Sequence, residues 1–315
     1  MTNRSESTRA TWRERAARAL PYALYLATWG STLAVGTFFY GDGDVARGLT
    51  FAAPLMIILT LHELGHYCQL RRHGLKTSPP FFLPAPVPPL GTFGAIIRIA
   101  ERLPNRRALF DVGVSGPLAG LAATLVFMAI GLALSQATPE ATPIPEEGAF
   151  VFGEPLLMKW LARWILGYRE GWTLALHPTA VAAWSGLLLT TLNLFPIGQL
   201  DGGHVFYALL RTRAVHAARG AYLLAVVAVI VFRAWHWTLF LILVAFLRLR
   251  HPATRDDALP LGATRGIIGW CALAFIVLGF TPNPIDYVER ESDESRVETP
   301  NDVDSPRLPF DDDGV

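Results

Sequence analysis

The sequence predicts an all-α polytopic membrane protein with six to seven transmembrane helices. Hydrophobic residues make up 52% of the 315-residue chain, and the mean hydropathy of +0.34 is too high for an ordinary soluble protein. Apolar runs alternate with arginine-rich segments, and several runs are long enough to cross a bilayer. A stretch rich in proline and glycine interrupts this pattern and predicts a re-entrant loop or a β-hairpin near the candidate functional residues described below.

Charge and cysteine content narrow the function classes. The formal net charge is +1 and no basic stripe is present, which argues against nucleic acid as a partner. The two cysteines, Cys68 and Cys271, lie in different apolar segments without C-x-x-C spacing, so no disulfide framework is predicted. The composition therefore points to a role within the lipid bilayer.

The N-terminal region predicts the orientation of the chain. Residues 1–19 are polar and arginine-rich, and residues 20–40 form an apolar run long enough to span a bilayer. A secretory signal begins similarly, but no small-residue cleavage site stands out at the end of this run. Because clustered arginines stay inside, we predict a cytoplasmic N-terminus and a first transmembrane helix. A second span, residues 49–70, returns the chain to the cytoplasm.

The second span contains the pattern His-Glu-Leu-Gly-His at residues 62–66. Residues four apart face the same side of a helix, so the imidazoles of His62 and His66 can reach one metal ion. Glu63 points to the adjacent flank, where its carboxylate can take a proton from an attacking water. Such groups are costly to place in a lipid-embedded helix, which indicates a function. The alternative is a chance pair of histidines that bond to other helices.

The stretch over residues 78–98 is expected to lie close to this metal. Its prolines forbid a regular helix, and the apolar residues after Gly91 and Gly94 suit a short strand. Irregular backbone at membrane depth is tolerated only where it is buried or lines a wet cavity. We predict an edge strand for an extended substrate, with Gly91, Phe93 and Gly94 as substrate-binding residues. A cytoplasmic surface loop is the alternative.

The remaining apolar runs supply the later spans. Small residues that allow close helix packing characterise the third span, and Pro196 is expected to end the fourth. An external connection over residues 135–177 contains an amphipathic segment that is too short to span and is expected to lie in the outer interface. The predicted spans after the second are residues 112–134, 179–195, 222–233, 235–247 and 266–280.

A catalytic zinc site usually has three protein ligands and one open position, so the two histidines need a third partner. Asp201 is the strongest candidate, because Pro196 and the nearby glycines predict an unwound stretch at the cytoplasmic boundary. His204 is its competitor, since the glycines would let either side chain reach the site. Asp111 is a further candidate but sits beside an arginine-rich loop. We predict one Zn²⁺ ion per chain.

Two motifs together resemble the site-2 protease family of intramembrane zinc metalloproteases. These are the His-Glu-Leu-Gly-His pattern and the run Asn-Leu-Phe-Pro-Ile-Gly-Gln-Leu-Asp-Gly-Gly at residues 193–203. The segments Gly-Thr-Phe-Gly-Ala at 91–95 and Ser-Gly-Pro at 115–117 are similar to segments of that family, and the likeness covers about residues 45–250. No PDZ-like insertion is seen, so the subgroup without this module is the closer likeness.

The resemblance implies a role for each candidate residue. His62, His66 and Asp201 would bind zinc, and Glu63 would be the general acid and base. Asn193 would help to hold the substrate or the oxyanion, although a helix-ending hydrogen-bonder is the alternative for this residue. A membrane protease of another family would instead use a downstream glutamate as its third ligand.

The expected function is hydrolysis of peptide bonds within or near transmembrane segments of single-pass membrane proteins, with the lipid bilayer as the second partner. The predicted parts are a cytoplasmic segment (1–19), a transmembrane metalloprotease domain (20–281) and an acidic disordered tail (282–315). No long transit peptide is visible, which favours a prokaryotic plasma membrane. A metal-binding transporter or sensor would not need Glu63 between the histidines, and an inactive relative could act as a membrane chaperone.

Overall fold

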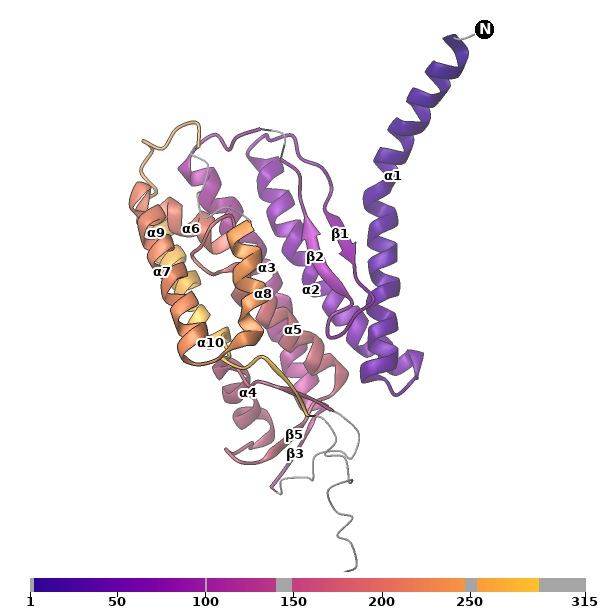
Figure 1. Ribbon diagram of the computed structural model, residues 1–315, viewed down its shortest axis with the longest axis vertical. Helices are drawn as coiled ribbons and strands as arrows, with labels where there is room; N and C mark the ends of the chain where they lie inside the picture. Colours follow the sequence, from indigo (N-terminus) through magenta and orange to yellow (C-terminus); the bar gives the residue numbers. More distant parts are fainter. Residues whose placement is uncertain (1–2, 100, 140–148, 247–253, 289–315) are drawn as a thin grey trace, which may run out of the picture.

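The structure, a computed structural model, describes residues 3–99, 101–139, 149–246 and 254–288 and is mostly helical (Figure 1). In chain order the elements are α1 (Asn3–Val35), a π-helical turn (Gly36–Tyr40), α2 (Val45–Arg72), β1 (Phe81–Pro84), β2 (Thr92–Ile96), α3 (Arg106–Ala133), β3 (Gln136–Thr138), β4 (Ala149–Phe152), α4 (Leu156–Leu166), β5 (Thr173–Ala175), α5 (Pro178–Asn193), α6 (Asp201–Leu210), α7 (Thr212–Val231), a 3-10 turn (Trp235–Trp237), α8 (Thr238–Phe246), α9 (Ala263–Ala274), α10 (Ile276–Gly279) and β6 (Ile285–Val288).

Within the described ranges, three helices are long and apolar enough to cross a membrane, namely α2, α3 and α7. The apolar helical stretches Trp235–Phe246 and Ala263–Gly279 are shorter, and α5 has 16 residues. The predicted helical fold is thus confirmed, with three helices that could cross a membrane. The total of six to seven spans stays a prediction.

Several helices begin earlier than their apolar runs. The first predicted span started at residue 20, but α1 begins at Asn3. Similarly, the span predicted over residues 222–233, with an N-terminal extension from Ala217, was expected to be short for a full span. Helix α7 begins at Thr212, which makes it long enough to span. Arginine is a good helix former, and its charged head can reach water while its stem lies along the helix. Apolar runs therefore mark the lipid-facing part of a helix and miss its polar beginning.

Helices α2, α3 and α5 form the centre of the protein, with α1 on one side and α6–α10 on the other (Figure 1). Glycines allow the central backbones to approach closely. A Cβ on Gly65 of α2 would lie 2.5 Å from the carbonyl oxygen of Ser115 in α3. The Trp184 side chain of α5 is fully buried, and its indole donates a hydrogen bond to the carbonyl of Gly153 at 2.7 Å. The centre is therefore a tightly packed frame for the site described below.

The structure contains a β-hairpin in the proline- and glycine-rich stretch, as one of the two predicted forms. Strands β1 and β2 pair antiparallel, with Phe81 opposite Ile96 and Phe82 opposite Ala95. The hairpin lies between α1 and α2 (Figure 1). Its β1 side packs on α1, where the rings of Tyr25 and Phe82 meet edge to face with centroids 4.9 Å apart. One edge of the hairpin is thus covered by α1.

Two further strand pairs, which the sequence did not predict, lie near α4: β3 pairs with β5, and β4 pairs with β6. Strand β6 corrects part of the predicted disordered tail, because Ile285–Val288 is paired with Ala149–Phe152. The rest of that tail, residues 289–315, lies outside the described residues. Helix α4 is amphipathic as predicted: Met158 and Ala162 are buried, and Trp164 is 84% exposed.

Candidate metal centre

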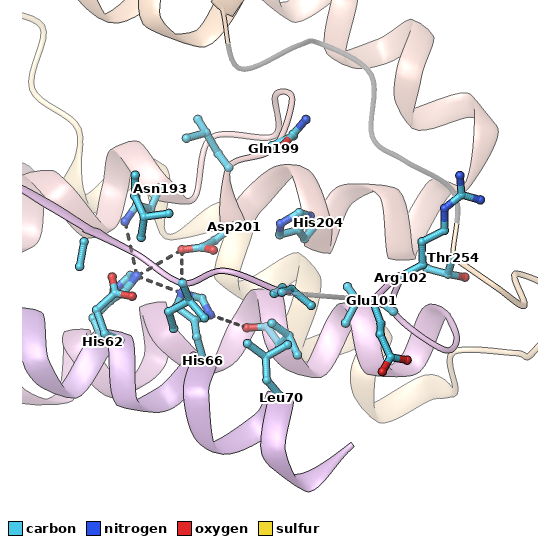
Figure 2. Close-up of a pocket in the computed structure, with 18 residues that line it drawn as sticks. His62, His66, Leu70, Glu101, Arg102, Asn193, Gln199, Asp201, His204 and Thr254 are labelled. Atoms are coloured by element: carbon cyan, nitrogen blue, oxygen red, sulfur yellow. Dashed lines mark hydrogen bonds and ion pairs between the residues drawn. The ribbon is translucent and has the colours of Figure 1, made fainter. Parts of the chain in front are cut away.

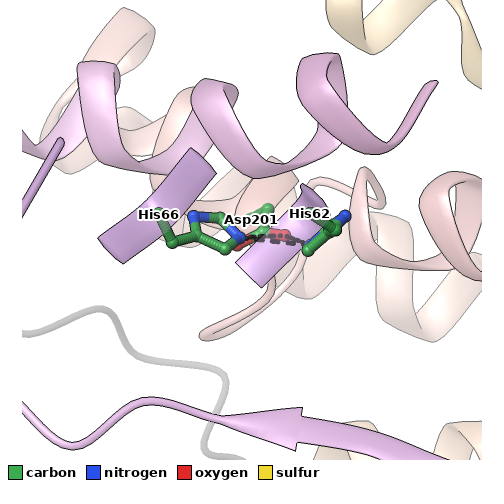
Figure 3. A group of neighbouring side chains, drawn as sticks. All are labelled: His62, His66 and Asp201. Atoms are coloured by element: carbon green, nitrogen blue, oxygen red, sulfur yellow. Dashed lines mark hydrogen bonds and ion pairs between the residues drawn. The ribbon is translucent and has the colours of Figure 1, made fainter. Parts of the chain in front are cut away.

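Two histidines of α2 form the base of the site. His62 and His66 are one helical turn apart, and their Nε2 atoms lie 3.1 Å from each other. Both side chains are buried. Because they share one face of the helix, both Nε2 atoms point to the same spot (Figure 3).

Asp201 reaches the same spot from a distant part of the chain. Its Oδ2 atom lies 3.2 Å from the Nε2 atom of each histidine. Among the described residues, His62, His66 and Asp201 are the one group of three side chains that could hold a metal ion, with all ligand atoms within 4.8 Å of one another. The structure therefore brings together the three residues that the sequence analysis named as ligands (Figure 3).

A tight turn between α5 and α6 places Asp201 next to the two histidines. Helix α5 ends at Asn193 and α6 begins at Asp201, so the unwound stretch is present, but Asp201 is the first residue of a helix rather than part of that stretch. A Cβ on Gly202 would overlap the carbonyl oxygen of Leu194. Only glycine lets α6 start so close to the end of α5, which holds the carboxylate over α2.

The distances fit a tetrahedral metal ion. With bonds of about 2.0–2.1 Å, tetrahedral zinc separates its ligand atoms by roughly 3.3 Å. The three observed separations are 3.1, 3.2 and 3.2 Å. Two imidazoles and one carboxylate are also a typical donor set for a catalytic zinc ion, which keeps its fourth position open. The residues present thus fit zinc in both number and spacing.

Helix α3 orients one of the imidazoles. The Nδ1 atom of His66 lies 2.8 Å from the carbonyl oxygen of Val112. If Nε2 binds a metal, Nδ1 carries the ring proton and donates it to this carbonyl, which fixes the tautomer. His62 has a different neighbour, since the amide nitrogen of Asn193 lies 3.4 Å from its Nε2 atom.

Two glycines of α3 make room for the histidines. A Cβ on Gly116 would overlap the Nε2 atom of His66, and one on Gly120 would lie 3.1 Å from Cβ of His62. From the sequence alone, these small residues predict only close helix packing. Their position shows that they shape the metal centre itself.

Replacing Gly116 by Ala should weaken zinc binding by about 10- to 100-fold, the range found when a residue that orients a ligand is lost. The added methyl group would occupy the place of the His66 Nε2 atom, so the ring must rotate away. Competition with a chromophoric chelator measures the affinity. Gly220→Ala on α7 is the matched control, because a Cβ there meets nothing within 4 Å. Equal affinities in the two variants would contradict this prediction.

The metal centre lies at one end of a cavity of about 700 Å³ (Figure 2). Glu63 is half-buried and lines this cavity next to His62 and His66. Strand β2 and the residues directly after it supply apolar lining residues, namely Ala95, Ile96, Ile97 and Ile99. The far end is polar and is lined by Glu101, Arg102 and Thr254. A peptide bond placed at the metal would therefore lie beside a carboxylate and along an apolar strand.

The predicted substrate-binding residues are not all at the cavity. Asn193 lines it, next to the metal ligands. Gly91 instead packs on α1, where a Cβ would lie 2.6 Å from Cα of Thr32. Phe93 is 77% exposed, and neither it nor Gly94 lines the cavity. The cavity is instead bordered by the residues that follow along the chain, Ala95, Ile96 and Ile97. Because these positions are consecutive, alternation along a strand would not have indicated them.

The other candidate ligands have different places. His204 lines the cavity, on the far side of Asp201 from His62 (Figure 2). Asp111 is held by Arg265, whose guanidinium lies 2.7 Å from its Oδ1 atom. Glu101, Arg102 and Thr254 carried no signal in the sequence, because the tertiary fold alone brings these loops to the cavity.

Comparisons with known proteins agree with this geometry. The family model described as peptidase family M50 matches residues 50–234. The chain is 38% identical over 161 residues to "Probable zinc metalloprotease EGY1, chloroplastic" of Oryza sativa subsp. japonica, covering 50% of this chain and 28% of that protein. It is 34% identical over 176 residues to "Probable zinc metalloprotease EGY2, chloroplastic" of Arabidopsis thaliana, covering 55% of this chain and 31% of that protein. The match thus spans less than a third of the length of these relatives. No solved structure matches the chain significantly.

Proposed function

The chain belongs to peptidase family M50, the site-2 protease family, and we propose that it is an intramembrane zinc metalloprotease. Its reaction would be hydrolysis of peptide bonds within or near transmembrane segments of membrane-protein substrates. The observation that carries this proposal is the convergence of His62, His66 and Asp201 in a cavity that Glu63 also lines. The plant relatives are named as zinc metalloproteases, which supports zinc as the metal.

The residues that line the cavity have separate roles in the proposed hydrolysis. A zinc ion held by His62, His66 and Asp201 would polarise the scissile carbonyl and acidify water at its open position. Glu63 takes the proton of the attacking water and passes it to the leaving amide nitrogen as the C–N bond breaks. Asn193 lies beside His62 and can donate its amide hydrogens to the substrate carbonyl oxygen.

The hairpin is the proposed binding site for the unwound substrate. A transmembrane helix hides its amides in its own hydrogen bonds, so it must become extended before cleavage. Helix α1 covers the β1 side of the hairpin, and residues of β2 line the cavity. An extended substrate can therefore add to β2 from the cavity side, next to the metal. The proposed binding site also includes Phe93 and Gly94, which directly precede the residues of β2 that line the cavity.

Replacing Ser31 by Ala should raise the KM for a membrane-protein substrate about fivefold, with kcat nearly unchanged. The Ser31 hydroxyl donates a hydrogen bond to the Gly91 carbonyl at 2.7 Å and so holds the hairpin against α1. A buried hydrogen bond contributes about 1 kcal/mol, which corresponds to that factor. Steady-state cleavage of a reconstituted substrate measures both constants. Ser31→Thr keeps a hydroxyl and should behave like the wild type, whereas a fall in kcat alone would contradict the assigned role.

The membrane topology is part of the proposal. Helices α2, α3 and α7 are long and apolar enough to span. The three shorter helical stretches, namely α5, Trp235–Phe246 and Ala263–Gly279, would bring the total to six, and the apolar part of α1 would bring it to seven. The arginine-rich segments then face the cytoplasm, including the N-terminal one, and the hairpin is re-entrant. We propose a prokaryotic plasma membrane and a single-pass membrane protein as the substrate. The rice and Arabidopsis relatives are named chloroplastic, so fractionation of the native cells is the direct test.

Metal removal tests the function. The purified chain in liposomes should cleave a co-reconstituted single-pass membrane protein, lose this activity with 1,10-phenanthroline, and regain it with one equivalent of Zn²⁺. A transporter would instead move zinc across the vesicle without cleaving the substrate, and a chaperone would bind it intact. Cleavage that persists without bound metal would contradict the proposal.

A further inference from the structure

A cluster of charged side chains lies next to the metal centre but outside the cavity. Asp111 of α3 accepts two hydrogen bonds from Arg265 of α9, from Nε at 2.7 Å and from a terminal guanidinium nitrogen at 3.0 Å. The Nε2 atom of His73, directly after α2, lies 3.2 Å from Oδ2 of the same carboxylate, the oxygen that also accepts from the terminal guanidinium nitrogen. The Asp111 side chain is 16% exposed. One carboxylate thus joins the ends of three helices.

This cluster borders the residue that orients a metal ligand. Asp111 immediately precedes Val112, whose carbonyl oxygen lies 2.8 Å from the Nδ1 atom of His66. The Ser115 hydroxyl donates a further hydrogen bond to that carbonyl at 3.0 Å. The position of this turn of α3 relative to α2 therefore determines where the His66 ring points.

Helix α9, which carries Arg265, packs against the turn of α3 that contains Asp111. A Cβ on Gly269 of α9 would lie 2.8 Å from the Phe110 ring, so α9 packs closely on the same turn of α3. The guanidinium of Arg265 forms a bidentate ion pair with the Asp111 carboxylate. These two directional hydrogen bonds resist rotation of that turn of α3 more than a single hydrogen bond would. Residue 265 also lies beyond the segment 50–234 that matches the family.

We propose that Asp111 and Arg265 are positioning residues of the metal centre. Their ion pair holds the α3 turn so that the Val112 carbonyl fixes the His66 imidazole with Nε2 toward the metal. Neither side chain touches the metal-binding atoms; both act through Val112. The inference rests on the proposed function, since it assumes that His66 binds zinc.

The test compares zinc binding in full-length variants. Arg265→Met removes the ion pair, and Asp111→Asn removes its charge while keeping the size of the side chain. Arg265→Lys keeps the positive charge but loses the bidentate geometry of the guanidinium. Lys159→Met is the matched control, because Lys159 forms an ion pair of similar exposure with Glu154 near the opposite end of the protein. Three measurements are made: zinc affinity by chelator competition, the absorption spectrum of the Co²⁺-substituted protein, and the Tm of the metal-free protein.

Arg265→Met and Asp111→Asn should each weaken zinc binding by about tenfold or more and shift the Co²⁺ spectrum, as expected when the support of a ligand is lost. Arg265→Lys should recover part of the affinity, and Lys159→Met should bind as the wild type does. A lower Tm with unchanged affinity and spectrum would show a purely structural ion pair and overturn the inference. If Arg265→Met does not fold, Asp111→Asn and Arg265→Lys decide the question. If the wild type binds no zinc, both the proposed function and this inference are overturned. If the wild type binds zinc and the variants bind it equally well, only this inference is overturned.

Discussion

Replacing Glu63 by Gln should reduce peptide cleavage by about 10²- to 10⁴-fold, the contribution expected of a general acid and base, and should leave one zinc ion per chain. Glu63 lines the cavity beside both histidines, but it does not belong to the group of three side chains that could hold the metal. Glutamine has the same shape and cannot accept the proton of the attacking water. The variant therefore separates proton transfer from metal binding.

Two measurements on the same preparation check this result: cleavage of a reconstituted substrate, and zinc content by atomic absorption. Asp44→Asn is the matched control, because it also replaces a carboxylate by an amide. Asp44 is the exposed N-cap of α2, and this variant should retain activity. Loss of zinc from Glu63→Gln would mean that Glu63 is a ligand, and retained cleavage would remove it from the chemistry. Because the inactive variant should still bind its substrate, cross-linking and mass spectrometry of its partners would also identify that substrate.

The sequence was most informative where residues near each other in the chain carry the chemistry. The pair His62 and His66 needs only helical periodicity to share a metal, and the structure places their Nε2 atoms 3.1 Å apart. The proline- and glycine-rich stretch excluded a helix, and the hairpin is present. Asp201 is different, because general rules left His204 open as a competitor. The unwound stretch predicted around it favoured Asp201, and the resemblance to a family then implied the same residue.

Contacts between distant segments were beyond such reasoning. Strand β4 pairs with β6 from the far end of the chain, and strands of 4 residues leave no clear periodic signal. The ion pair of Asp111 joins residues 154 positions apart. The polar end of the cavity depends on similar contacts, since the amide of Arg255 donates to the Leu103 carbonyl at 3.0 Å and brings Thr254 to the cavity. Such pairings depend on how helices stack, which a single sequence does not encode locally.

Replacing Asp201 by Asn should weaken zinc binding by more than about 100-fold, which exceeds the loss expected for a residue that only supports a ligand. The Asp201 carboxylate lies 3.2 Å from both Nε2 atoms and supplies the only negative charge within that group of three. A neutral amide oxygen is a much weaker partner for a dication. Chelator competition measures the affinity, and cleavage should fall with zinc occupancy.

His204→Gln is the decisive comparison, because His204 lines the same cavity and competes with Asp201 as the third ligand on sequence grounds. It lies three residues further along the first turn of α6, so both variants alter the same helix end. Zinc should remain bound in His204→Gln and be lost in Asp201→Asn. Three residues of an α-helix turn about 300° and rise about 4.5 Å. The reverse result would therefore require α6 to rotate by about 60° and to shift by about 4.5 Å along its axis, which the close contact between Gly202 and Leu194 opposes. A site in which both variants kept zinc would have no protein ligand from α6, and the assignment of a hydrolytic centre would then have to be abandoned.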